Sequence, residues 1–381
     1  MQWHDVGERG IMLPALHRGF RTHLLRAATV LTCFAVAFIA AKPTSASQTL
    51  SPQLTNAISS ASPIEYIPLV VLFSNPIAID ELENDDSTGP GLKRRALLIE
   101  PVKARFKMTS GLLMERLREL ETAGLAKDIR PIWMANAVAA EVASSSISQL
   151  EEVCRGARLD LDERRNVLQD QSRESSVGSQ SLPDEHWFTA VGDTAWGVKK
   201  IGAPEAWADG ITGEGVLVAI LDTGVLYTHS DLQNRIWNNP GEIQGNLIDD
   251  DANGYVDDYM GYDFVSDDGD PLDDLGHGTH VAGTICGDGT GGRRTGVAPG
   301  ARLMICKVID SIGQESESEI WEGIQYAFEN GADVLNLSYG WKQEWGPNRA
   351  TWRTICDYAA AAGVIMCVAA GNERAAGPAD R

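Results

Sequence analysis

Apolar residues after position 188 gather in short runs that are separated by longer segments of mixed character. The runs have the length of strands and are nearly all apolar, whereas the segments between them have the length of helices. Strands that are apolar on both faces and alternate with helices predict an α/β fold with a parallel sheet covered on both sides. The expected strands are Val216–Leu221, Arg302–Ile309, Val334–Ser338 and Val364–Ala369, and the expected helices are Thr279–Cys286, Glu317–Asn330 and Thr351–Ala362.

Residues 64–168 follow a different order. Strands are expected at Tyr66–Phe73, within the apolar stretch Ile129–Val142 and at Arg158–Leu161, and a helix at 102–123 that ends at Gly124. A second, short helix is expected after Ser146, which is spaced from Gln149 as in a capping box. The order β-α-β followed by α-β predicts a small α+β, ferredoxin-like domain.

Polar or small residues flank these two regions. Residues 48–63 are rich in Ser, Thr, Ala and Pro and are predicted to be a linker, and 81–91 a loop. Residues 169–187 are polar and predict an exposed interdomain linker that is easily cleaved. Residues 188–381 then form the third region.

The N-terminus has the pattern of a targeting segment. Arginines precede the apolar run Ala27–Ala41, and small residues follow it as far as Ala46. This pattern predicts a removed signal peptide over residues 1–47, hence a secreted protein without stable membrane association. The run is short for a membrane span, and an uncleaved signal anchor is the alternative.

The chain has a formal net charge of −21, and the negative charge is concentrated. Eleven Asp fall between Asp249 and Asp274, and no Lys or Arg occurs between Arg235 and Arg293. The charge excludes a nucleic-acid partner, since a phosphate-binding surface needs clusters of Lys and Arg. The acidic segment is either a solvated face or a cation site.

The first apolar strand of the third region ends on Asp222-Thr223-Gly224. Such an Asp can belong to an acid/base pair of two carboxylates, or it can orient a histidine that activates a serine. The segment Gly276–Gly283, GHGTHVAG, favours the second chemistry, in which His277 is the general base and Asp222 holds its tautomer. Gly276 and Gly278 are expected to let a substrate backbone come close. An aspartic protease needs a second Asp-Thr-Gly or Asp-Ser-Gly, which the sequence lacks, or a homodimer, and it leaves the His277 segment unexplained.

The segments VAILDTGV, GHGTHVAGTI, DVLNLSYG and VAAGN occur in the order found in the subtilisin-like serine proteases, the subtilase or peptidase S8 family. The chain resembles that family from about Trp187 to Arg381, and residues 64–168 resemble its inhibitor-I9-like propeptide. The resemblance implies a subtilisin-like three-layer fold, polypeptide substrates and a propeptide that inhibits its own enzyme.

The resemblance also implies roles for individual residues. Asp222 would orient His277, the general base, and the Asn372 amide would contribute to the oxyanion hole. Thr223 and Gly224 would shape the turn after Asp222. The segment that binds substrate would be Leu337, Ser338, Tyr339 and Gly340.

The family's serine nucleophile is expected in a Gly-Thr-Ser-Met-Ala-type segment beyond Asn372, and Gly-Thr-Ser occurs nowhere in the 381 residues. We therefore expect a partial sequence whose catalytic domain and sheet are incomplete, and which is inactive without its C-terminal part. The alternative is a catalytically dead pseudoprotease or a propeptide-type protease inhibitor.

The acidic segment contains spacing typical of a calcium loop. An EF-hand-like loop that begins at Asp249 would have Asp251 and Asn253 at its next alternate positions and Asp257 at its ninth. Gly254 would make the sharp turn of that loop. The twelfth position holds Met260 in place of the bidentate Glu, so the motif is incomplete. The resemblance favours calcium, and a solvated acidic loop is the alternative.

Overall fold

The computed structural model of the chain describes residues 49–79, 92–168 and 193–371. The predicted signal peptide, the 81–91 loop, the 169–187 linker and Asn372 lie outside the described residues. No helix within the described ranges is long and apolar enough to cross a membrane.

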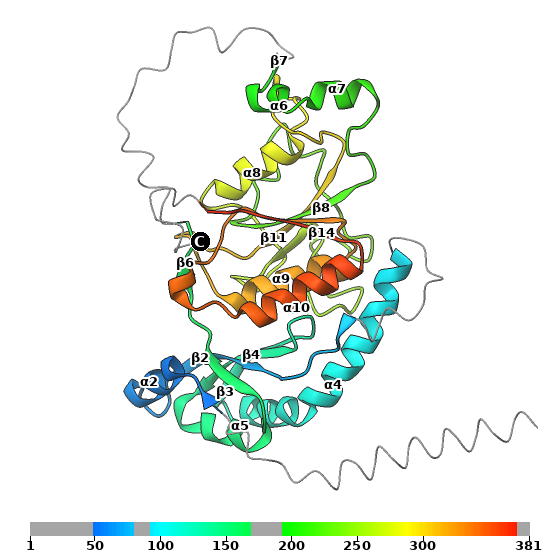
Figure 1. The fold of residues 1–381 in the computed structure, drawn as a ribbon. Coiled ribbons are helices and arrows are strands. Elements are labelled where there is room, and N and C mark those ends of the chain that lie inside the picture. The colour runs from blue at the N-terminus through cyan, green and yellow to red at the C-terminus, as the bar shows by residue number, and fades with distance from the viewer. Residues whose placement is uncertain (1–48, 80–91, 169–192, 372–381) are drawn as a thin grey trace, which may run out of the picture. The chain divides into compact units, whose positions relative to one another are not determined.

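The C-terminal region is built on one sheet of five parallel strands in the order β14-β13-β8-β11-β9 (Figure 1). The strands are β8 (Leu217–Asp222), β9 (Gly261–Asp263), β11 (Arg302–Lys307), β13 (Val334–Leu337) and β14 (Ile365–Val368). The main helices are α8 (His277–Cys286), α9 (Glu317–Glu329) and α10 (Arg349–Ala361). The predicted α/β fold with a parallel sheet is confirmed, and so are its four predicted strands and three predicted helices, within a few residues at each end.

Alternation along β8 explains why this strand is apolar up to its last residue, Asp222. Val218 and Ile220 belong to the cluster that includes α8, whereas Ala219 and Leu221 belong to the cluster that includes α9 and α10. Successive side chains of a strand point to opposite faces, so a strand buried on both faces has no polar position. Helix α8 covers one face of the sheet and helices α9 and α10 cover the other, which gives three layers (Figure 1).

The N-terminal region forms a second five-stranded sheet, in the order β1-β5-β2-β4-β3. Its strands are β1 (Thr49–Leu50), β2 (Tyr66–Leu72), β3 (Ala126–Ile132), β4 (Ala137–Ala143) and β5 (Arg158–Leu161). Its helices are α2 (Pro52–Ser60), α4 (Leu92–Thr122), the 3₁₀ turn η1 (Ser144–Ser146) and α5 (Ile147–Val153).

Three expectations for this region are wrong. Residues 48–63 are not an irregular linker, because Ser51 caps α2 by accepting the Leu54 N–H (3.2 Å) and Pro52 fits the first helical turn. The stretch Ile129–Val142 is a hairpin rather than one strand, and it turns at Asn136, which has a φ of 51°. Ser146 makes no capping bond, since a 3₁₀ turn leads directly into α5.

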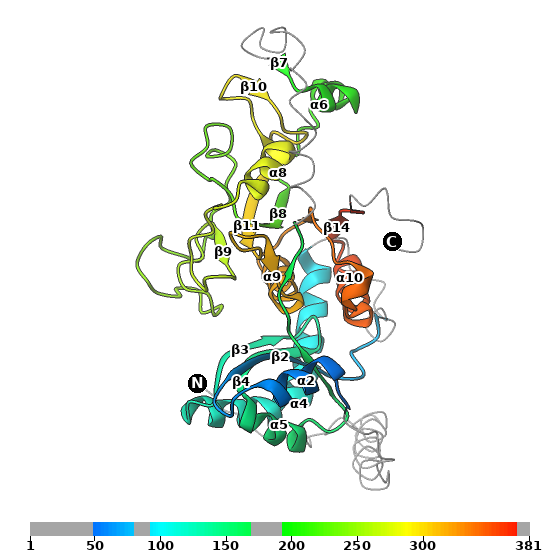
Figure 2. The same cartoon turned by 90° about the vertical axis from the view of Figure 1, so that its left-hand side faces the viewer.

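The hairpin turn of the N-terminal region packs against α9, and Figure 2 shows α9 beside β3. The Trp133 indole donates to Glu329 (2.9 Å), and the Met134 N–H donates to the Gln325 side chain (3.3 Å). On β3, Arg130 pairs with Glu322 (3.2 Å). Several of these groups are buried, so the two sheets share one continuous apolar core around α9.

Short elements complete the described chain. They are β6 (Arg165–Asn166), β7 (Asp193–Thr194), α6 (Trp196–Lys200), α7 (Ala203–Ala208), β10 (Arg293–Arg294), β12 (Gln314–Glu315) and η4 (Gln343–Trp345). Strand β6 pairs antiparallel with β12, and β7 pairs parallel with β10. The β6–β12 pair therefore joins the end of the N-terminal region to the loop that precedes α9.

Candidate active site

Asp222 is the last residue of the central strand β8 and is 0% exposed. Its Oδ1 accepts the Thr223 N–H at 2.8 Å. In open parallel sheets, reactive groups gather outside the carboxyl ends of the strands, and Asp222 lies at such an end.

His277 is the first residue of α8 and meets Asp222 across this edge. Its Nδ1 lies 2.6 Å from Asp222 Oδ1. An ionised carboxylate can only accept a hydrogen bond, so Nδ1 carries the proton and donates it. This bond fixes the tautomer in which Nε2 is the free acceptor, as a general base requires.

The surroundings raise the pKa of His277 above its ordinary value of 6.5. Burial of the ring acts in the opposite direction and is the largest single influence. The hydrogen bond and charge of Asp222, together with the charge of Asp273, outweigh it because both favour the imidazolium. The site therefore stabilises the protonated histidine that forms when a general base takes a proton.

Asp273 is a functional residue that the sequence reasoning missed. Its Oδ1 accepts the Thr223 hydroxyl (2.8 Å) and the N–H groups of Leu275 (3.0 Å) and Gly276 (2.7 Å). Its Oδ2 accepts both the N–H (2.8 Å) and the hydroxyl of Thr279. Burial works to raise the pKa of Asp273, but these hydrogen bonds outweigh it and lower the pKa. Asp273 thus ties the start of α8 to the turn after Asp222; its only sequence signal is its place four residues before His277.

Gly278 has a structural role that the sequence did not predict. A Cβ at this position would lie 2.1 Å from the Gly224 carbonyl oxygen and 3.2 Å from Asp222 Oδ1. The Gly278 N–H also donates to the Thr223 hydroxyl at 2.9 Å. Gly278 therefore admits the protein's own Asp-Thr-Gly turn, and the approach of a substrate backbone stays a prediction. Gly276 has a φ of 98°, which glycine adopts without strain.

The predicted substrate-binding segment follows β13, the neighbour of β8. Leu337 is paired in register with Leu221, next to Asp222. Leu337 and Tyr339 are buried, Gly340 is exposed, and the Ser338 hydroxyl accepts the Asn336 side-chain amide (2.9 Å). The segment thus lies at the same sheet edge as Asp222 and His277, and its role in substrate binding stays a prediction.

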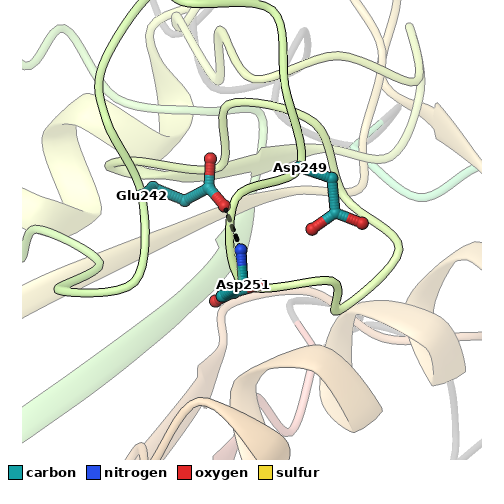
Figure 3. Close-up of side chains that lie close together, drawn as sticks. All are labelled: Glu242, Asp249 and Asp251. Carbon is teal, nitrogen blue, oxygen red and sulfur yellow. Dashed lines mark hydrogen bonds between the residues drawn. The ribbon is translucent and has the colours of Figure 1, made fainter.

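The acidic segment brings Glu242, Asp249 and Asp251 together, with one carboxylate oxygen of each within 4.8 Å of the others (Figure 3). Glu242 Oε1 accepts the Asp250 and Asp251 N–H groups, while its Oε2 is buried and has no hydrogen-bond partner in the described part of the chain. Sequence reasoning missed Glu242 because it precedes the loop pattern by seven residues.

The structure does not bring Asp257 into this group. Both Asp257 oxygens accept backbone N–H groups, from Gly245, Asn246 and Leu247. The Asn253 amide donates to Asp258 (3.0 Å). Of the three predicted carboxylate ligands, Asp249 and Asp251 share the acidic group found in the structure, and metal binding by Asn253 and Asp257 stays a prediction.

Comparison with known proteins gives the family of this site. Residues 213–380 match the subtilase family. This part of the chain is a subtilase domain. Its three-layer α/β architecture is that of the subtilase fold, with Asp222 and His277 both inside the matched range.

The chain is also similar to several bacterial subtilases. It is 38% identical over 181 residues to the minor extracellular protease Vpr of Bacillus subtilis, covering 45% of this chain and 19% of that protein. It is 37% identical over 185 residues to the major intracellular serine protease of the same organism (48% and 51%). Over 184 residues it is 35% identical to subtilisin E (48% and 41%). The chain thus spans about half the length of these curated relatives, or less.

Proposed function

We propose that the protein is a secreted subtilisin-like serine endopeptidase, made as a zymogen. The observation that carries the proposal is the 2.6 Å contact between Asp222 and His277 at the carboxyl edge of the parallel sheet. Membership of the domain in a family of serine endopeptidases supports it. The predicted signal peptide, and a relative named as an extracellular protease, support secretion.

In the proposed reaction, His277 Nε2 takes the proton of a serine hydroxyl as that hydroxyl attacks the peptide carbonyl. His277 then returns the proton to the leaving amine, and a second round with water releases the acyl group. Asp222 holds the imidazole in place and stabilises the imidazolium. Asn372 would donate its amide to the oxyanion, and Leu337–Gly340 would pair with substrate.

Residues 64–168 are proposed to be the inhibitory propeptide. Their hairpin packs on α9, and β6 at their end adds as an antiparallel strand to β12. Addition of an extended segment to a strand edge is how many proteins hold a peptide. Cleavage within 169–187 would then free the mature enzyme.

Calcium is proposed as a structural cofactor. Glu242, Asp249 and Asp251 offer carboxylate oxygens, which are the ligands that calcium prefers. The buried, unpartnered Oε2 of Glu242 fits a cation, because a buried carboxylate oxygen without a partner is costly. When bound, calcium would neutralise these carboxylates and hold the acidic loop together.

The function is tested by sequencing the transcript beyond the Arg381 codon and by assaying the protein that it encodes. We expect a Gly-Thr-Ser-containing continuation, labelling by a serine-reactive organophosphate and hydrolysis of casein. His277→Ala should abolish casein hydrolysis and self-processing, while Asp357→Asn, an exposed charge on α10, should leave both intact. A stop codon directly after Arg381, or normal processing by His277→Ala, would overturn the proposal.

A further inference from the structure

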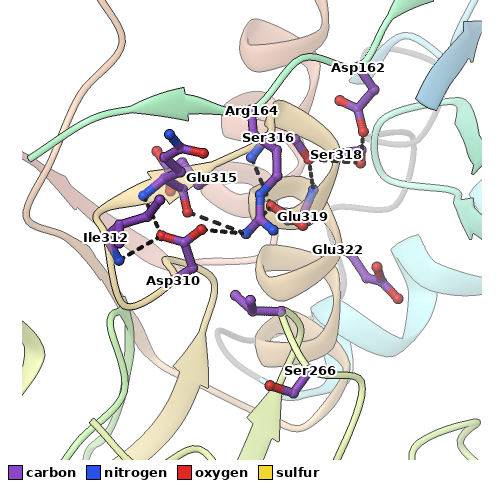
Figure 4. A network of polar contacts seen from close by, with 12 residues as sticks. Asp162, Arg164, Ser266, Asp310, Ile312, Glu315, Ser316, Ser318, Glu319 and Glu322 are labelled. Carbon is purple, nitrogen blue, oxygen red and sulfur yellow. Dashed lines mark hydrogen bonds and ion pairs between the residues drawn. The ribbon is translucent and has the colours of Figure 1, made fainter. Parts of the chain in front are cut away.

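Arg164, the residue just before strand β6, lies against a pair of carboxylates in the C-terminal region (Figure 4). The Arg164 guanidinium lies 3.4 Å from Glu319 Oε2 and 3.7 Å from Asp310 Oδ2. The same nitrogen donates to the Gln314 carbonyl at 3.3 Å. Arg164 therefore touches two acids and a backbone oxygen around the strand with which β6 pairs.

The two carboxylates are held in place without Arg164. Asp310 Oδ1 accepts the N–H groups of Ile312 (3.0 Å) and Gln314 (2.8 Å), which leaves Oδ2 for the arginine. Glu319 accepts the Ser316 N–H (2.8 Å) as part of the capping box of α9. These anchors belong to the C-terminal region itself, so they do not depend on the N-terminal region.

Burial makes this pair selective for charge. The side chains of Asp310 and Glu319 are 18% and 11% exposed, so an apolar group placed beside them would leave both carboxylates poorly solvated. An arginine or lysine satisfies them with charge-assisted hydrogen bonds.

The β6–β12 pairing determines where a basic side chain of a bound polypeptide would lie. Asn166 is paired with Gln314 and Arg165 with Glu315, and the Val167 N–H donates to the Gly313 carbonyl (2.9 Å). A substrate strand added to β12 in this register would carry one residue to the position of Arg164, next to the acidic pair.

We infer that Asp310 and Glu319 are specificity-determining residues that select polypeptides with arginine or lysine at the position of Arg164. The inference rests on the proposed endopeptidase function and adds its substrate class. Arg164 would hold the site in the zymogen until it is replaced by a basic residue of the substrate.

The first experiment needs no catalysis and uses the 381-residue chain. Amide exchange of Val167 reports on the β6–β12 pair. Asp310→Asn with Glu319→Gln keeps the oxygen acceptors of both anchors and should speed exchange about tenfold, and Arg164→Ala should do the same. The combination should add little, because both changes remove one interaction. Glu344→Gln removes an exposed charge from η4 and is the matched control.

Additive effects, or an acid-pair variant that exchanges like the native chain, would overturn recognition of arginine by this pair. If the acid-pair variant unfolds, Arg164→Lys and Arg164→Glu examine the same contact from the other side. Lysine should keep most of the Val167 protection and glutamate should lose it, whereas equal exchange in the two variants would overturn the inference.

The second experiment measures kcat/KM of the active protease on fluorogenic peptides that differ only at the Arg164 position. Arginine and lysine should exceed leucine about tenfold, and Asp310→Asn with Glu319→Gln should remove that preference. Cleavage without a basic preference overturns the inference and spares the proposed function. Cleavage of no peptide counts against the proposed function, and Val167 exchange then decides the role of the acidic pair.

Discussion

Asp273→Asn is the change that most directly tests how the Asp222–His277 pair is held in position. The substitution keeps Oδ1, so the bonds from Thr223, Leu275 and Gly276 can persist. It replaces Oδ2 with an NH₂ group, which then faces the N–H of Thr279 as donor against donor.

The magnitude follows from the two hydrogen bonds that Thr279 donates to Oδ2. A hydrogen bond to a charged group contributes about 1.5–3 kcal/mol, so two would contribute about 3–6 kcal/mol. The Thr279 hydroxyl can rotate and accept from the new NH₂ group, and the site is partly solvated, so we expect a loss of about 2–4 kcal/mol in the free energy of unfolding.

The same variant should lower the pKa of His277, because the charge of Asp273 contributes to raising it. Urea unfolding measures the first effect, and an NMR titration of the imidazole measures the second. Asp357→Asn, which removes an exposed charge from α10, is the control. A loss below about 0.5 kcal/mol together with an unchanged pKa of His277 would refute the view that Asp273 positions the histidine.

Three other predictions follow from the same contacts. Gly278→Ala would place a Cβ 2.1 Å from the Gly224 oxygen, so it should lower the free energy of unfolding in urea by about 3 kcal/mol. It should also weaken the Asp222–His277 hydrogen bond, which the NMR signal of the His277 Nδ1 proton reports. Because folding raises the pKa of His277, the imidazolium stabilises the folded state fully below about pH 6.5, and this stabilisation is lost as pH rises through the folded pKa. The free energy of unfolding, measured across about pH 5–9, should lack this pH dependence in His277→Gln. Calcium should raise Tm, and Glu242→Gln should weaken calcium binding about tenfold in isothermal titration, whereas the control Glu344→Gln should leave it unchanged. A Tm that does not change when a chelator is added would contradict the site.

The sheet of the C-terminal region could be predicted because burial on both faces makes each strand a continuous apolar run. Strand β8 is such a run, and its end on Asp222 pointed directly to the site. The hairpin at 133–136 was missed because its turn residues, Trp133 and Met134, are themselves buried against α9. Tertiary packing thus concealed the polar signal that turns usually carry.

Asp273 and Glu242 were missed for a different reason. Asp273 accepts N–H groups two to six residues ahead of it, and Glu242 accepts N–H groups eight and nine residues ahead, which the folded loop brings within reach. Hydrophobic periodicity predicts helices and strands, and the EF-hand spacing predicts one kind of calcium loop. The loops that contain Asp273 and Glu242 match neither pattern. Asp257 illustrates the limit, since its spacing did not predict that its carboxylate holds the backbone of residues 245–247.

The acidity of the segment between Asp249 and Asp274 follows from its scarcity of regular structure, since β9 is the one strand within it. Backbone N–H groups that no sheet or helix satisfies need acceptors, and the short Asp side chain supplies them locally. Asp249 accepts two such groups, Asp257 three and Asp273 three. Organising the loops in this way gathers eleven carboxylates without a Lys or Arg in the segment. Lys307 of β11 offsets part of their mutual repulsion by pairing with Asp263 (3.3 Å) and Asp274 (3.0 Å). The repulsion that is left supports the proposal of calcium at Glu242, Asp249 and Asp251.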